Sequence, residues 1–148
     1  MVMATITRST EVGFELPPVS MQMRLEHWIE REDYQQKGNP GFHSATNIHT
    51  DVEAAKLEGL KAPVAGGPLL LSQISRMMML AFAEGWVQGG KLSAKIVKPA
   101  HATDFTTAKG IIREKIPEGS AIRFICDVWV EKQTGEKAIV GTASGLVR

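Results

Sequence analysis

The chain has 148 residues, a length that fits one domain and is too short for two ordinary ones, so we expect a single domain over residues 1–148. Hydrophobic residues make up 43% and charged residues 22% of the sequence, a balance that excludes a disordered or fibrous protein. The formal net charge is +1, from 17 basic and 16 acidic residues, so we expect no nucleic-acid or anionic-lipid partner.

The single cysteine and the apolar runs indicate the cellular setting. Cys126 cannot form an internal disulfide, and it lies in an apolar, strand-like run where burial is the ordinary role. The longest apolar stretch, residues 68–83, contains Gln73 and Arg76 and is too interrupted for a membrane span. The N-terminus carries no apolar signal core. We therefore expect a cytoplasmic location and no membrane partner.

The N-terminal part of the chain predicts an edge strand followed by a helix. Pro17 and Pro18 interrupt a weakly alternating segment, and adjacent prolines hold the backbone extended without amide donors, so an edge segment is expected there. The apolar positions of residues 21–34 fit both strand alternation and one helix face, which we interpret as a strand and then a helix. The sequence KGNPG at residues 37–41 marks a loop.

A short helix is predicted over residues 51–58. Thr50 and Glu53 have the spacing of a capping box, in which each side chain binds a backbone amide of the first turn. Asp51 is expected to act as a first-turn charge on the helix dipole. Gly59 ends this helix.

The strongest helical signal covers residues 68–84. Apolar residues recur there at helical spacing, and further leucines and methionines fill the other faces, so we expect a helix buried nearly all round. Pro68 suits its first turn, and Gly85 is predicted to end it.

The rest of the chain predicts antiparallel strands. Residues 92–96, residues 105–116 and the segment after Thr134-Gly135, which reads as a hairpin turn, all have strand character. The clearest alternation places Ile122, Phe124, Cys126, Val128 and Val130 on one face. One buried helix followed by long antiparallel strands predicts an α+β protein, a single hot-dog domain in which a curved sheet wraps a long central helix.

Two residues around the start of the long helix could support chemistry. A glycine before a buried helix leaves a first-turn amide accessible, and such an N–H can stabilise an oxyanion, so Gly67 is our candidate. His49 lies in a loop with Thr46 and Asn47, and histidine is suited to proton transfer near neutral pH. A histidine in a turn is also an ordinary packing or surface residue, so this reading stays open.

A metal site has little support in the sequence. The chain has four histidines and one cysteine without paired-ligand spacing, and His43 and His49 lie six residues apart across a predicted loop. We therefore expect no metal.

Several segments together resemble one family of enzymes. They are Asn47-Ile48-His49-Thr50-Asp51, Ala54-Ala55, Gly59, Pro63-Val64-Ala65-Gly66-Gly67 and Leu69-Leu70-Leu71, with Val12-Gly13 and Leu16-Pro17-Pro18 before them and Pro99 to Asp104 after them. The sequence is similar to that of the MaoC-like, (R)-specific enoyl-CoA hydratases, over nearly the whole chain. At the last segment Thr103-Asp104 stands where that family usually has Gly-Asp.

The resemblance implies a hot-dog homodimer with acyl-thioester sites at the subunit interface. Such an enzyme adds water to a trans-2-enoyl thioester or removes it from a 3-hydroxyacyl thioester, and it needs no cofactor, because coenzyme A or an acyl carrier is part of the substrate. His49 falls on the family's catalytic histidine and Gly67 on its oxyanion-hole glycine. Ser75 falls on a small polar position of the central helix that faces the pocket.

The chain departs from the family at one catalytic position. The family reads Asp-x-Asn-Pro-x-His, whereas this chain has Ser44-Ala45-Thr46-Asn47-Ile48-His49, and Gly66 replaces a histidine before the oxyanion-hole glycine. Serine holds no negative charge at neutral pH, so the water loses part of its base.

Three substitutes for the missing acid are open: His49 works alone with Ser44 or Thr46 holding the water, His43 takes part, or Glu32 or Asp33 approaches. Each also has an ordinary solvent-exposed or packing role. In all, we predict catalytic roles for His49, Gly67 and Ser44, and substrate-binding roles for Asn47, Thr46, Ser75, Gly66 and His43.

The sequence favours a hydratase or dehydratase of acyl thioesters. Two alternatives remain: an accessory protein that binds the thioester without hydrating it, and a hot-dog thioesterase.

Overall fold

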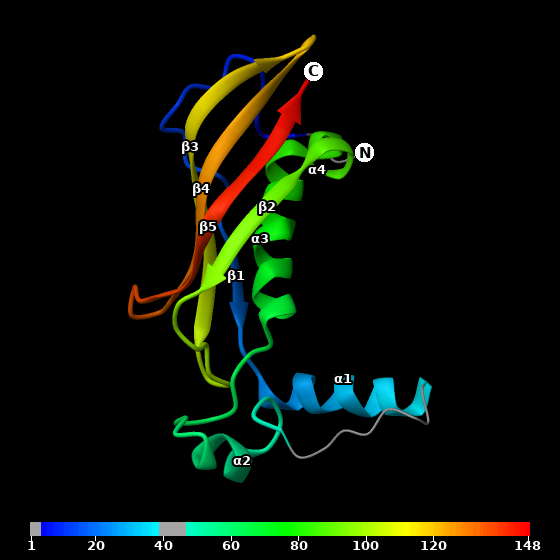
Figure 1. Ribbon diagram of the computed structural model, residues 1–148, viewed down its shortest axis with the longest axis vertical. Coiled ribbons are helices and arrows are strands. Elements are labelled where there is room, and N and C mark those ends of the chain that lie inside the picture. Colours follow the sequence, from blue (N-terminus) through cyan, green and yellow to red (C-terminus); the bar gives the residue numbers. More distant parts are fainter. Residues whose placement is uncertain (1–3, 39–46) are drawn as a thin grey trace.

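A five-stranded sheet curved around one long helix makes up most of the computed structural model, which describes residues 4–38 and 47–148 (Figure 1). In sheet order the strands are β1 (Val19–Gln22), β3 (Phe105–Glu118), β4 (Ala121–Lys132), β5 (Lys137–Val147) and β2 (Lys91–Ile96), and all neighbours are antiparallel. The helices are α1 (Leu25–Gly38), α2 (Val52–Leu57), α3 (Gly67–Phe82) and α4 (Glu84–Gly89). This is the α+β hot-dog fold that the sequence predicts, with α3 as the central helix.

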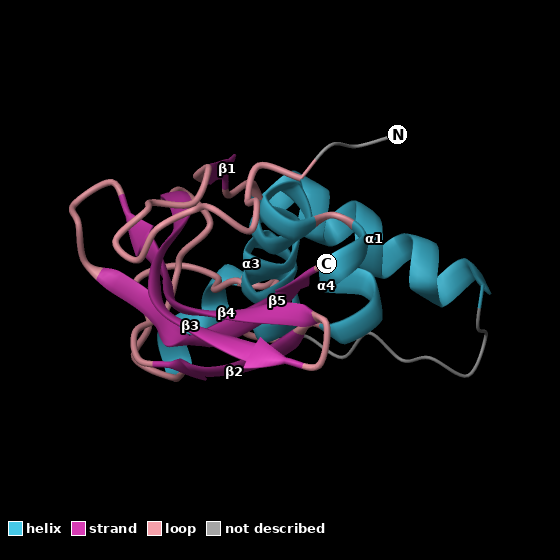
Figure 2. Cartoon of the chain, turned by 90° about the horizontal axis from the view of Figure 1, so that it is seen from above, coloured by secondary structure: helices cyan, strands magenta, loops and turns pink. Residues whose placement is uncertain are grey.

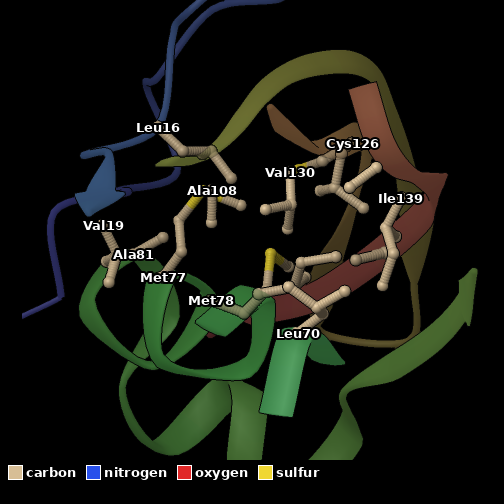
Figure 3. Packing of buried hydrophobic residues seen from close by; sticks show 14 of the residues in the cluster. Leu16, Val19, Leu70, Met77, Met78, Ala81, Ala108, Cys126, Val130 and Ile139 are labelled. Atoms are coloured by element: carbon tan, nitrogen blue, oxygen red, sulfur yellow. The ribbon is translucent and has the colours of Figure 1, made fainter. Parts of the chain in front are cut away.

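The core lies between α3 and the concave face of the sheet. Figure 3 shows α3 side chains such as Leu70, Met77 and Met78 packed toward Cys126 and Val130 of β4. The alternation predicted for β4 is confirmed, because Phe124, Cys126, Val128 and Val130 are all buried while the residues between them are half-buried. Burying each large apolar side chain stabilises the fold by about 1.5–3 kcal/mol, so this layer dominates the stability.

Polar side chains are also buried at this core, among them Gln73 of α3 with 1% and Thr106 of β3 with 0% of the surface exposed. The Gln73 amide donates hydrogen bonds to the carbonyls of Val19 at 2.8 Å and Thr106 at 3.0 Å, and its oxygen accepts one from the Thr106 hydroxyl at 2.9 Å. Gln73 therefore ties the edge strand β1 and the start of β3 to the central helix.

The face of α3 that points away from the sheet is not covered by residues 4–38 or 47–148, the part of the chain that the structure describes. Met79 and Leu80 keep 36% and 39% of their surface exposed, and Leu69 and Leu71 are half-buried. The expectation of a helix buried nearly all round is therefore wrong for one copy of the chain. The physical reason is that the sheet wraps only one side of α3 (Figure 1).

The end of the central helix also differs from the expectation. Helix α3 stops at Phe82, and Ala83, with a φ of 47°, turns the chain directly into α4, so Gly85 lies inside α4 and does not end the long helix. A Cβ atom at Gly85 would lie 1.8 Å from the backbone oxygen of Leu146. Gly85 is small because α4 packs closely against β5.

The short helix α2 is capped one residue later than the sequence predicts. The Asp51 carboxylate accepts a hydrogen bond from the Ala54 amide at 2.7 Å, whereas the Thr50 amide still donates to the Asn47 carbonyl in the preceding turn. The chain is therefore still turning at Thr50, and Asp51 rather than Thr50 is the N-cap. Gly59, with a φ of 78°, follows the helix as expected.

The helices α1 and α2 lie at the end of the molecule where α3 begins, and α1 extends outward from that end (Figures 1 and 2). None of the helices in the described ranges is both long and apolar enough to span a membrane.

Candidate active site

The imidazole of His49 is held in one orientation. Its Nδ1 atom lies 2.8 Å from the backbone oxygen of Val64. A carbonyl oxygen can only accept, so in the neutral ring Nδ1 carries the hydrogen and donates it. The other nitrogen, Nε2, is then left with a lone pair that can take a proton.

The turn that carries His49 is fixed by short-range hydrogen bonds. The Asn47 side-chain oxygen accepts a hydrogen bond from the His49 amide at 2.8 Å. The Val64 amide donates to the Ile48 carbonyl at 3.0 Å, so Val64 is bound to this turn both through its amide and through the imidazole. Asn47 was predicted to bind substrate, and what the structure shows is that its side chain positions the His49 backbone.

The segment that contains Val64 is in turn held by the loop before β3. The Ala65 amide donates to the Ala100 carbonyl at 2.7 Å, and the Ala102 amide donates to the Pro63 carbonyl at 2.8 Å. These bonds place residues 63–65 between the His49 turn and the 100–102 loop. The segment that binds the imidazole, residues 63–65, is therefore itself held in place by the 100–102 loop.

The second predicted catalytic group, the amide of Gly67, lies at the first turn of α3. Gly66 is the N-cap and Pro68 follows in the first turn, so the chain enters the helix as predicted. The amides of a first turn have no partner inside the helix, and the helix dipole makes this end electropositive. Gly67 therefore fits the stabilisation of an oxyanion.

His49 and Gly67 line the same cavity, which has a volume of about 400 Å³. The rest of its lining is apolar and includes Leu60, Leu70 and Ile96; among the described residues around it, Lys98 has the one permanently charged side chain. A cavity of this size and character suits an apolar chain with a reactive group placed at the histidine.

A second cavity, of about 230 Å³, also has His49 in its wall. The start of α3 contributes Gly66, Pro68 and Leu69, and helix α1 contributes Trp28 and Arg31. His49 and the beginning of α3 therefore separate two hollows of different chemistry, one apolar and one with a guanidinium group in its lining.

The remaining predicted site residues are placed only in part. Ser75 of α3 lines neither of these two cavities; its hydroxyl accepts a hydrogen bond from the Trp86 indole N–H at 3.0 Å. Ser44, Thr46 and His43 lie outside the described residues, so their roles stay predictions. The substitutes Glu32 and Asp33 fall within α1.

Sequence reasoning missed the Val64 carbonyl and the two α1 residues of the smaller cavity. The carbonyl belongs to the backbone, which has no signature in the sequence. Trp28 and Arg31 lie three positions apart, a spacing that puts them on one helix face, but nothing local indicates that this face meets His49.

The lone cysteine belongs to the hydrophobic core and not to this site. Cys126 is fully buried in the core, and burial, together with the nearby Asp127 carboxylate, raises the pKa of its thiol to about 12 against a small opposing effect of Arg113. It is a core residue, as expected, and not a nucleophile. Among the described residues, no three or more His, Cys, Asp or Glu side chains are grouped so as to hold a metal ion.

Solved structures share this fold over nearly the whole chain. One is an (R)-hydratase from A. caviae involved in PHA biosynthesis, with a TM-score of 0.69 and 19% identity, covering 95% of this chain and 98% of that one. A MaoC-like dehydratase from Rhodospirillum rubrum has a TM-score of 0.67 and 18% identity, covering 93% and 92%. The C-terminally truncated 3R-hydroxyacyl-ACP dehydratase complex HadBC from Mycobacterium tuberculosis has a TM-score of 0.63 and 14% identity, covering 93% and 98%.

No protein-family model matches the sequence, and no curated protein matches it. The three solved structures are each less than 20% identical to this chain, so the likeness establishes the fold. The resemblance to MaoC-like dehydratases and (R)-hydratases is thereby confirmed for the architecture, and the chemistry has to be argued from the site.

Proposed function

We propose that the protein hydrates a trans-2-enoyl thioester to the 3-hydroxyacyl thioester, or catalyses the reverse dehydration. One observation carries this proposal: the first amide of a long helix and an imidazole whose Nε2 has no hydrogen-bond partner among the described residues line the same apolar cavity. The hydratases and dehydratases among the solved structures with this fold support the same reaction class.

In the hydration direction the acyl chain lies in the apolar cavity with its thioester carbonyl at the Gly67 amide. His49 Nε2 takes a proton from water while the water oxygen bonds to C3 of the enoyl group. The electron pair of the C2–C3 double bond moves toward the carbonyl oxygen, where the Gly67 N–H and the α3 dipole stabilise the negative charge. The imidazolium then gives its proton to C2, so that one water molecule is added.

The Val64 carbonyl takes part in this scheme as a positioning group. It fixes the Nδ1–H tautomer before the proton transfer, and it accepts the same hydrogen bond from the imidazolium afterwards. In the proposed reaction Ser44 or Thr46 holds the water that a carboxylate would otherwise orient.

We further propose that the working form is a homodimer. Met79 and Leu80 of α3 leave an apolar stripe exposed, and the outer edge of β2 has no neighbouring strand within the described chain. Exposed apolar surface and a free strand edge are each typical of a subunit interface. The HadBC structure, a complex with this fold, supports such an assembly.

The direct test is an assay of the purified protein with trans-2-enoyl-CoA substrates of several chain lengths. Loss of the enoyl absorbance without release of free thiol is the expected result, since hydration leaves the thioester intact. Release of thiol from saturated acyl-CoA would contradict the proposal and identify a thioesterase.

A second candidate, a thioester-binding protein without turnover, is favoured by one observation, the serine at position 44. The variant Ser44→Asp restores the acid of the family pattern and separates the two functions. If the wild-type protein binds acyl-CoA but is inactive and the variant gains hydratase activity, the binding function is correct. Activity in the wild-type protein that the variant leaves unchanged or lowers supports the hydratase.

A further inference from the structure

The smaller cavity beside His49 contains a cation that the proposed hydration does not use. Arg31 lines this hollow of about 230 Å³ together with Trp28, Thr50 and the first residues of α3. Among the described residues of its lining, Arg31 has the one permanently charged side chain. The Arg31 side chain is exposed to solvent and lines the same hollow as His49, so a ligand in this hollow can reach its guanidinium group, from which a purely apolar acyl chain would gain nothing.

The guanidinium is available for a ligand. In the part of the chain that the structure describes, Arg31 forms no ion pair, whereas Arg113 and Arg123 bind Asp127 and Glu118. The electropositive start of α3 lies in the same wall, through Gly66 and Pro68, and adds to the attraction for negative charge. Arginine presents a fork of N–H donors that matches a carboxylate or phosphate.

The size of this cavity limits what it can hold. Its volume of about 230 Å³ is smaller than the roughly 400 Å³ of the other cavity at His49, so it suits a smaller group. The lining also includes the Trp28 indole, which offers an apolar wall for a short carbon chain. A short acyl group that ends in an anion fits this combination.

We propose that Arg31 binds an anionic group of the thioester and thereby selects the substrate. The anion is either a second carboxylate on the acyl group or a phosphate of its carrier; the two share the same charge-assisted hydrogen bonds to the guanidinium. This inference rests on the proposed thioester function, because it takes His49 as the reacting centre that the two cavities share.

The test measures binding by titration calorimetry with four non-hydratable ligands: glutaryl-CoA, pentanoyl-CoA, and the glutaryl and pentanoyl thioesters of pantetheine. The glutaryl and pentanoyl groups have equal carbon numbers and differ in the terminal carboxylate, and pantetheine lacks the phosphates of coenzyme A. The full chain is compared with Arg31→Gln. The control is Arg24→Gln, an exposed arginine just before α1 that lines neither cavity at His49.

We expect Arg31→Gln to raise the Kd roughly 10- to 100-fold for every ligand that carries the recognised anion. Weakening of both glutaryl ligands identifies the acyl carboxylate, and weakening of both coenzyme A ligands identifies the carrier phosphate. Arg24→Gln should change neither, and Arg31→Lys should recover part of the affinity because it keeps the charge.

The inference is overturned if the wild-type chain binds these ligands and Arg31→Gln leaves every Kd unchanged at an unchanged unfolding temperature. That result would leave the thioester pocket intact. If the wild-type chain binds none of the four ligands, the inference fails together with the proposed function.

Discussion

The central layer of α3 on the sheet and the turn that carries His49 line the same cavity, but they are held together differently. Helix α3 buries seven side chains, whereas α2, which follows the His49 turn, buries only Ala55. The His49 turn is fixed by backbone and Asn47 hydrogen bonds to its neighbours. Stability therefore resides mainly in the layer of α3 and the sheet, whereas the proposed chemistry depends on a segment that contributes little to stability.

The sharpest way to separate the two regions is His49→Ala. We expect turnover of the enoyl thioester to fall by about 10²–10⁴, the usual contribution of a general acid or base, while the free energy of unfolding changes little. Turnover is followed by enoyl absorbance and stability by thermal unfolding.

The matched control is His27→Ala, which removes an exposed histidine of α1 outside both cavities. Unchanged turnover in His49→Ala would remove this residue from the mechanism.

The opposite effect is expected from Gln73→Leu in the core. The substitution leaves the carbonyls of Val19 and Thr106 and the Thr106 hydroxyl with fewer partners in a buried place, so the unfolding free energy should fall by roughly 1–3 kcal/mol. The melting temperature should drop by a few degrees per kcal/mol, and turnover per folded molecule should persist.

Gln88→Leu, the same change at an exposed position of α4, should have almost no effect on the melting temperature. Loss of turnover in folded Gln73→Leu would show that the two regions are coupled through α3.

Asp104 lies between the 100–102 loop, which binds the segment next to His49, and the first residue of β3. Burial alone would raise the pKa of its carboxyl, but hydrogen bonds from the His101 amide and the Gln133 side chain, with the charges of Lys132 and His101, outweigh burial and lower that pKa below its usual 3.8. A lowered pKa in the folded state means that the ionised carboxylate stabilises the fold at pH values above 3.8, and that this stabilisation is lost as the pH falls further.

We therefore expect Asp104→Asn to lower the unfolding free energy by about 1–3 kcal/mol at pH 7, with a smaller difference from the wild type as the pH falls below about 3.8. Denaturant unfolding at several pH values measures both effects. Asp127→Asn, which breaks an exposed ion pair with Arg113, should cost much less. A difference that does not depend on pH would contradict the assigned charge effect.

The smallest effect concerns the reactivity of Cys126. With its pKa raised to about 12 by burial, the thiol is almost wholly protonated at pH 8, so iodoacetamide should label it only in the unfolded chain. Mass spectrometry after short exposure, with and without denaturant, measures this. Rapid labelling of the native protein would show that the core opens.

Local patterns predicted much of the fold correctly. The period-two alternation of β4 and the hairpin at Thr134-Gly135 appear in the structure, and the apolar helix predicted over residues 68–84 is present as α3 (Gly67–Phe82), because each depends on neighbours in the chain. The incorrect predictions concern two kinds of position. In one, two neighbouring residues could both cap a helix; in the other, a segment distant in the sequence determines why a glycine is present. Thr50 and Asp51 could both cap α2, and Gly85 of α4 lies against the backbone of Leu146 in β5.

In the candidate site, too, local features were predictable and contacts between distant segments were not. The sequence alone singled out His49 and Gly67, since their residue types and the family resemblance carry the signal. It could not show that the Val64 carbonyl selects the imidazole tautomer, or that Arg31 lies in the wall of a cavity with His49.

The residue types of the site and the periodicity of most elements were predictable from local sequence, and together with the family resemblance they predicted the α+β hot-dog architecture. The covered faces of α3, the strand order β1-β3-β4-β5-β2 and the side chains that share a cavity with His49 became known from the folded structure. The physical reason is range: periodicity and capping act between residues a few positions apart, whereas a cavity is formed by segments that meet only when the chain has folded.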